Sequence, residues 1–158
     1  MELPKRKPNR LPCFNYNTPG AYFITICTKD RQCILWRTVG ASIARPPLSH
    51  CGRIVEEAIC AIPSHYPAVS IDHYVVMPNH VHLLLQIHTD EDGHAMPSPT
   101  ISHIIQQMKG IVTKRLGYSP WQKLFHDHVI RNEWDYLKIW EYIDYNPLRW
   151  KEDCFYIE

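Results

Sequence analysis

Short apolar segments alternate with segments of helical periodicity along most of the chain. Runs of β-branched and aromatic residues predict strands, and a run of three leucines that is apolar on both faces predicts a central strand. The expected strands span residues 21–28, 69–77 and 80–88. Residues 33–36 also favour a strand, and a short edge strand is expected within residues 121–131.

Three further segments carry apolar residues at the i, i+3, i+4 spacing that places them on one face of a helix. The first follows Ser49, an expected N-cap, and ends at prolines. The second runs from the N-cap Thr100 to Gly117 as its C′ residue. The third begins near Asn132 and ends before Pro147, which cannot continue a helix. The expected helices span residues 48–65, 100–118 and 132–145.

The order of these elements mixes strands with helices and joins two strands through the tight turn at Pro78-Asn79. This order predicts an α+β fold in which an antiparallel sheet of the ferredoxin-like type is covered by helices. A chain of 158 residues fits one domain, expected over residues 21–158. Residues 1–20 are expected to form a basic N-terminal arm, and a plain disordered terminus is the alternative.

The composition is that of a globular protein, with 45% hydrophobic and 21% charged residues. Six cysteines form no CxxC pair, which argues against a zinc ribbon or a thioredoxin-type motif. The N-terminal segment lacks the apolar core of a signal peptide, and no apolar run approaches the ~20 residues that span a bilayer. We therefore expect a cytoplasmic protein with reduced cysteines and no membrane partner.

The formal net charge of +1 hides an uneven distribution. Residues 101–131 contain five basic residues and one acidic residue, whereas residues 132–158 contain three basic and seven acidic residues. Aromatic residues are interleaved with the basic ones, a combination that suits single-stranded or hairpin nucleic acid. A solvated helix face is the alternative explanation. The candidate DNA-binding residues are Lys109, Lys114, Arg115 and Arg131.

The sharpest chemical feature is the pair His80 and His82 directly after the turn. In a strand, residues i and i+2 point to the same face with Cα atoms about 6.5–7 Å apart, so two imidazoles can converge on one divalent ion. Their place near a strand end would let such a site open to solvent. The alternative is a pair of histidines on a half-covered sheet face.

The last helix carries a second group of polar residues. Lys138, Tyr142 and Asn146 recur at four-residue intervals, so they share one helical face. The tyrosine is a candidate nucleophile, the asparagine a candidate metal ligand and the lysine a possible charge stabiliser. The alternative is a partly buried tyrosine and an asparagine that ends the helix. The expected packing side consists of Trp134, Leu137, Trp140 and Ile143.

In combination, these features resemble the REP-associated tyrosine transposases, which belong to the single-tyrosine (Y1) branch of the HUH nuclease superfamily. The resemblance extends from about Tyr22 to Trp150. It rests on four features in a fixed order, namely VVMPNHVHLLL, a basic helix, WQKLFHDHVIR and YIDYNP.

The resemblance implies that His80 and His82 are metal ligands, that Asn146 is the third ligand and that Tyr142 is the nucleophile. It also implies a ferredoxin-like α+β domain and Mg²⁺ or Mn²⁺ as the ion. Tyr136 and Tyr145 are rival nucleophiles. Tyr142 is favoured because Tyr145 lies about 100° around the helix from Asn146 and Tyr136 lies off the shared face.

The implied function is a DNA transposase that cuts and rejoins single-stranded or hairpin DNA through a 5′-phosphotyrosine intermediate. Two other functions stay open at this point. One is a ferredoxin-like nucleic-acid-binding protein that does not cut, and the other is a metal-dependent hydrolase in which water is the nucleophile. Both a monomer and a homodimer are compatible with the sequence.

Overall fold

The computed structural model describes residues 14–16, 18–37, 46–96 and 99–158. Its strands form one antiparallel sheet in the order β2-β3-β1-β4. In chain order, the elements are β1 (Gly20–Cys27), the 3₁₀ segment η1 (Lys29–Arg31), α1 (His50–Cys60), α2 (Ile62–His65), β2 (Val69–Val76), β3 (His80–Ile87), α3 (Ile101–Leu116), β4 (His126–Ile130), α4 (Glu133–Tyr145) and the 3₁₀ segment η2 (Asn146–Glu152).

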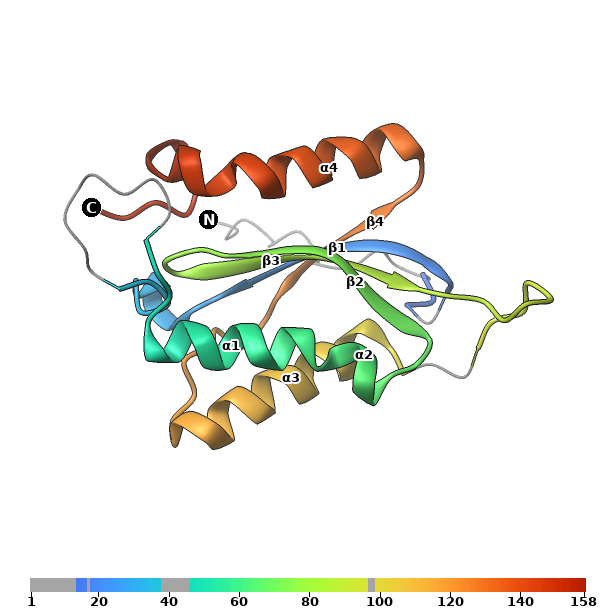
Figure 1. Ribbon diagram of the computed structural model, residues 1–158, viewed down its shortest axis with the longest axis horizontal. Helices are drawn as coiled ribbons and strands as arrows, with labels where there is room; N and C mark the ends of the chain where they lie inside the picture. The colour runs from blue at the N-terminus through green and yellow to red at the C-terminus, as the bar shows by residue number, and fades with distance from the viewer. Residues whose placement is uncertain (1–13, 17, 38–45, 97–98) are drawn as a thin grey trace, which may run out of the picture.

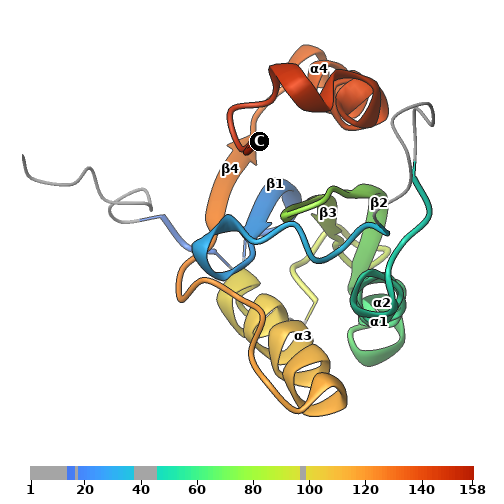
Figure 2. The ribbon, with the colours of Figure 1, turned by 90° about the vertical axis from the view of Figure 1, so that its left-hand side faces the viewer.

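The sheet separates two helical layers, with α1, α2 and α3 on one face and α4 on the other (Figures 1 and 2). The order β1-α1-β2-β3-α3-β4 is that of a ferredoxin-like domain, so the expected α+β fold class is confirmed. The fourth helix is an addition to this arrangement that covers the second face of the sheet.

The central strand β3 is buried on both faces, as its three leucines predict. Val81, Leu83 and Leu85 join the large core beneath α1 and α3. Leu84 belongs to the smaller core beneath α4. Because side chains alternate along a strand, His80 and His82 also face the α4 layer.

Residues 33–36 do not form the expected second strand. Only an isolated bridge joins Trp36 to Leu48. The segment instead packs against the end of the sheet. There Leu35 is fully buried, and the Trp36 indole donates a hydrogen bond to the carbonyl of Val76 at 2.7 Å. A short apolar run carries no signal that distinguishes such a packed segment from a strand.

The expected packing side of α4 is also wrong in part. Trp134 and Leu137 are exposed by 67% and 57%, whereas Ile139 and Ile143 are buried against the sheet. The buried face of α4 is therefore rotated from the face that carries its largest apolar side chains. The size of an apolar side chain alone does not predict its burial here, because two of these large side chains lie on the surface.

The basic residues of the expected arm and residues 38–45 lie outside the described residues. Within the described part of the first 20 residues, Phe14 and Tyr16 pack against the large core. The described cysteines are free thiols. No helix in the described ranges is long and apolar enough to cross a membrane.

Helix α1 packs closely against the backbone of Leu35 at Gly52, where a Cβ atom would lie 2.1 Å from the Leu35 carbonyl oxygen. A backbone carbonyl, unlike a side chain, cannot rotate away from an added methyl group. We therefore expect Gly52→Ala to lower the free energy of unfolding by about 1–3 kcal/mol. Gly110 on α3 is the matched control, because a Cβ there meets nothing within 4 Å. Gly110→Ala should stabilise the helix by about 0.5–1 kcal/mol. Urea unfolding measures both variants, and a Gly52→Ala variant as stable as the wild type would contradict the close packing.

Candidate active site

Two buried histidines meet at the start of β3. The Nε2 atoms of His80 and His82 lie 3.1 Å apart, and both side chains are 1% exposed or less. The Nδ1 atom of His80 lies 2.8 Å from the Oδ1 atom of Asn79, and the Nδ1 atom of His82 lies 2.8 Å from the Thr25 hydroxyl. Each ring is thus held from behind with its Nε2 atom turned inward, as in histidines that bind metals.

The hydrogen-bond network determines the tautomer of His80. The amide nitrogen of Asn79 donates to the carbonyls of Arg31 and Phe155, so its Oδ1 atom is left to accept from Nδ1–H of His80. The Nε2 atom of His80 therefore carries a free lone pair. The Thr25 hydroxyl can donate or accept, so it can adapt to either tautomer of His82.

Burial keeps both imidazoles uncharged. Burial lowers the pKa of His80 to about 4, and the nearby Asp153 carboxylate offsets only part of this lowering. Burial, followed by the neighbouring His80, lowers the pKa of His82 well below its ordinary value. Neutral imidazole is the form that binds a metal ion, so neither ligand has to lose a proton at neutral pH.

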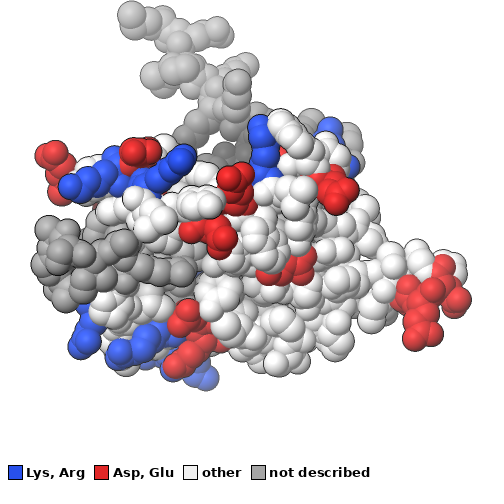
Figure 3. Space-filling view, turned by 45° about the horizontal axis from the view of Figure 1, so that its top comes forward, with Lys and Arg blue, Asp and Glu red and all other residues white. Residues whose placement is uncertain are grey.

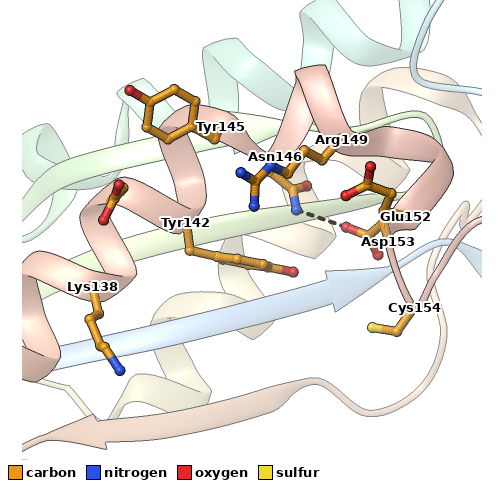
Figure 4. A pocket seen from close by; sticks show the side chains of 9 residues that line it. Lys138, Tyr142, Tyr145, Asn146, Arg149, Glu152, Asp153 and Cys154 are labelled. Carbon is orange, nitrogen blue, oxygen red and sulfur yellow. Dashed lines mark hydrogen bonds between the residues drawn. The ribbon is translucent and has the colours of Figure 1, made fainter.

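Helix α4 brings Tyr142 and Asn146 to this pair. The Tyr142 ring lies 5.3 Å from the His82 ring and packs edge-on against Phe23. Burial, followed by the charges of Asp153 and Cys154, raises the pKa of Tyr142 to about 12. The Tyr142 hydroxyl points towards Asn146 and Asp153 (Figure 4). The hydroxyl therefore keeps its proton at neutral pH.

Asn146 lies beside the Tyr142 hydroxyl and Asp153 (Figure 4). It is 4% exposed, and its amide nitrogen donates to Asp153 at 2.8 Å. Its Oδ1 atom is buried and has no hydrogen-bond donor among the described residues. A buried acceptor without a donor is unfavourable unless a cation or another donor reaches it.

Asp153 is the site residue that the sequence analysis missed. Its fully buried carboxylate lies 3.8 Å from the Nε2 atom of His80. One donor atom from each of His80, His82 and Asp153 lies within 4.8 Å of the other two. No spacing in the sequence points to it, because the chain must first turn back after η2 to bring this residue to the sheet.

The donor set fits a divalent metal ion. Two neutral imidazole nitrogens, one carboxylate and one amide oxygen without a donor are available in a small buried volume. Nitrogen and oxygen donors of this kind suit Mn²⁺ and, where oxygens dominate the remaining shell, Mg²⁺.

A cavity of about 900 Å³ opens beside this group, and Tyr142, Asn146 and Asp153 are part of its wall. Lys138 also lines the cavity, but its ammonium group lies 3.6 Å from the centroid of the Trp134 ring. Tyr145 points away from Asn146 and Asp153 in Figure 4. The Tyr136 hydroxyl donates to Asp72, a residue of β2. Of the three tyrosines, only Tyr142 is directed at the histidine pair.

The candidate DNA-binding residues are not gathered on one surface. The Lys109 ammonium group donates to the carbonyls of Gln122 and Lys123, and Arg115 pairs with Glu57 at 2.7 Å. Lys109, Lys114 and Arg115 all belong to α3, on the face of the sheet opposite to Tyr142, whereas Arg131 directly precedes α4. Figure 3 shows side chains of both charge signs on the α4 side of the molecule.

Comparison with known proteins finds relatives that align with most of this chain. No family model matches the chain. An uncharacterised protein of Haemophilus influenzae is 33% identical over 172 aligned positions, which cover 97% of this chain and 94% of the relative. A protein of the same organism that is assigned to the REP-associated tyrosine transposases is 24% identical over 143 positions, covering 85% of this chain and 74% of the relative.

Two solved structures share the fold. A REP-associated tyrosine transposase bound to a REP hairpin superimposes with a TM-score of 0.65 at 23% identity, over 89% of this chain and 73% of that one. A protein of Deinococcus radiodurans assigned as a transposase gives a TM-score of 0.51 at 18% identity, over 85% of this chain and 95% of that one. The curated sequence relative and the fold of the hairpin-bound structure support the family that the ordered motifs around His80, His82 and Tyr142 indicate, the REP-associated tyrosine transposases.

Proposed function

We propose that this protein cuts and rejoins single-stranded or hairpin DNA, with Tyr142 as the nucleophile. The observation that carries the proposal is the convergence of the Tyr142 hydroxyl, at the wall of an open cavity, on two buried neutral histidines and Asn146. A relative with this fold is bound to a REP hairpin, which supports hairpin DNA as the substrate.

In the proposed reaction, the tyrosine oxygen forms a bond to phosphorus and the bond from phosphorus to the 3′ oxygen breaks. The leaving 3′ oxygen takes up a proton, so the products are a 5′-phosphotyrosine and a strand with a free 3′-hydroxyl. Attack by another 3′-hydroxyl reverses the step and joins strands without ATP, because the bond energy is kept in the phosphotyrosine. Tyrosine on a helix reaches a phosphate only where the strand is unpaired.

The chain's own groups have distinct parts in this reaction. Asn79 and Thr25 hold the rings of His80 and His82 in place. The Asp153 carboxylate lies 3.8 Å from His80 and lines the same cavity as Tyr142, and in this proposal it accepts the tyrosine proton. The cavity wall beside Tyr142 also includes Lys138, which supplies positive charge to the phosphate.

A divalent ion, Mg²⁺ or Mn²⁺, would be held by His80 and His82 with an oxygen of Asn146 or Asp153, and when bound it offsets negative charge on the scissile phosphate. The proposed contacts to hairpin phosphates are Lys114, Arg115 and Arg131, which are exposed. Lys109 and Arg115 are weaker proposals, because the Lys109 ammonium group is already bound to two carbonyls and Arg115 is paired with Glu57.

A covalent adduct tests the nucleophile. Incubation with 3′-labelled hairpin DNA that carries single-stranded flanks should give a labelled protein that survives SDS, since the fragment 3′ of the cut stays attached. Tyr142→Phe should abolish the adduct, whereas Tyr136→Phe and Tyr145→Phe should retain it. Circular dichroism would establish that each variant is folded.

Other outcomes of this experiment have clear meanings. An adduct mapped by peptide sequencing to Tyr136 or Tyr145 would overturn the assignment to Tyr142. Cleavage without an adduct would favour the hydrolase in which water attacks. Hairpin binding with neither cleavage nor adduct, over a range of hairpins and with Mn²⁺ present, would favour a binding protein that does not cut.

The metal proposal can be tested at Thr25, whose hydroxyl contacts the Nδ1 atom of His82. Thr25→Val keeps the shape of the side chain but removes the partner of His82 Nδ1, so the Mn²⁺ affinity measured by calorimetry should fall about 10-fold to 100-fold. Thr28→Val is the matched control, because the buried Thr28 hydroxyl donates to the carbonyls of Gln32 and Asn79 instead. It should lower stability but leave Mn²⁺ affinity unchanged. Equal affinities for Thr25→Val and the wild type, or cleavage in excess EDTA, would contradict the metal proposal.

A further inference from the structure

The indole of Trp134 on helix α4 is exposed and adds little to the packing of the fold. Trp134 is 67% exposed, and Tyr145, about three turns further along, is 51% exposed. Large aromatic side chains usually bury most of their surface, and leaving them in water gives the fold little stabilisation. Aromatic groups exposed beside a cavity are more typical of a surface that binds another molecule.

The exposed indole is paired with a cation. The Lys138 ammonium group lies 3.6 Å from the centroid of the Trp134 ring, a cation–π contact that restrains both side chains. Lys138 also lines the cavity that contains Tyr142. The ammonium covers one face of the indole, so a base that stacks on the opposite face would lie next to a positive charge suited to its phosphate.

The spacing along the helix connects this pair to the nucleophile. Trp134, Lys138 and Tyr142 are four residues apart, so they form one stripe with a rise of about 6 Å per step. The distance of about 12 Å from Trp134 to Tyr142 along the axis corresponds to three or four stacked nucleotides at about 3.4 Å each. A strand cut at Tyr142 could therefore reach the indole within a few nucleotides.

The charges of α4 divide between its two flanks. Asp135 and Asp144 are bound to the sheet through His128 and His73, at 2.8 Å and 3.0 Å. Lys138 forms no ion pair within the described part of the chain, and Arg149 lies with it on the cavity wall. Glu141, Glu152 and Asp153 line the same cavity, so its lining holds three acidic and two basic residues. Stacking, rather than net charge, would then dominate the attraction.

We infer that the flank of α4 formed by Trp134 and Lys138 holds the unpaired nucleotides next to the cut, with a base stacked on Trp134 and a phosphate on Lys138. This inference rests on the proposed function of Tyr142, since it gives that site its strand-binding part. Because every base has a π face, the contact is tolerant of sequence. The occupant is single-stranded DNA, and a second copy of this chain is the alternative to be tested.

Fluorescence anisotropy with labelled dT12 in EDTA tests the surface without cleavage. Trp134→Ala should weaken dT12 binding about tenfold, as expected for the loss of one stacked base. Lys138→Ala should weaken it less and reduce the slope of log affinity against log salt by about 1. Leu137→Ala is the matched control, because Leu137 is 57% exposed on the same helix but points to its other side. It should bind dT12 as the wild type does.

A blunt DNA duplex is the second probe, and all four proteins should bind it equally. Unchanged dT12 binding by Trp134→Ala, or an equal loss with the duplex and with Leu137→Ala, would overturn the inference. A shift from dimer to monomer in sedimentation, with dT12 binding intact, would instead assign the surface to a second copy. If the wild type forms no adduct but Trp134→Ala still weakens dT12 binding, the strand surface stands and the Tyr142 function fails.

Discussion

The pairing register between β1 and β3 is the constraint on which the candidate site depends. It sets Thr25 opposite His82 and Cys27 opposite His80. Because strand side chains alternate with a period of two, a slip of one residue would turn both imidazoles into the core under α1 and α3. The same slip would expose Val81, Leu83 and Leu85 to the α4 layer. Burial of these apolar residues thus enforces the register, and the register places the histidines.

Helix α4, which carries Tyr142, is held in a different way. The core beneath α4 is small and consists of Val75, Met77, Leu84, Ile139 and Ile143. Polar contacts at several points along the helix supplement it. His73 stacks on Trp140 and bonds to Asp144, while Tyr136 bonds to Asp72. Directional contacts of this kind specify the rotation of the helix, and that rotation directs Tyr142 towards His82.

The ends of the site come from segments without regular periodicity. Asn79 belongs to the turn before β3, and Asp153 follows η2 near the C-terminus. The amide nitrogen of Asn79 bonds to the carbonyl of Phe155, so the turn and the C-terminal segment are tied together over the histidine pair. The environment that lowers the pKa values of His80 and His82 is therefore assembled from β3, α4 and the C-terminal segment.

Periodicity and capping residues determined the strands, the helices and the ferredoxin-like order, because burial of a sheet face or helix face leaves a local pattern. The spacings of His80 with His82 and of Tyr142 with Asn146 are likewise local, so their shared faces follow from strand and helix geometry. Only the tertiary structure decided that Asp153 joins the histidines, that Trp134 and Leu137 lie outside, and that residues 33–36 pack against the end of the sheet. Each of these depends on contacts between segments distant in the chain, where packing overrides the preference of any single segment.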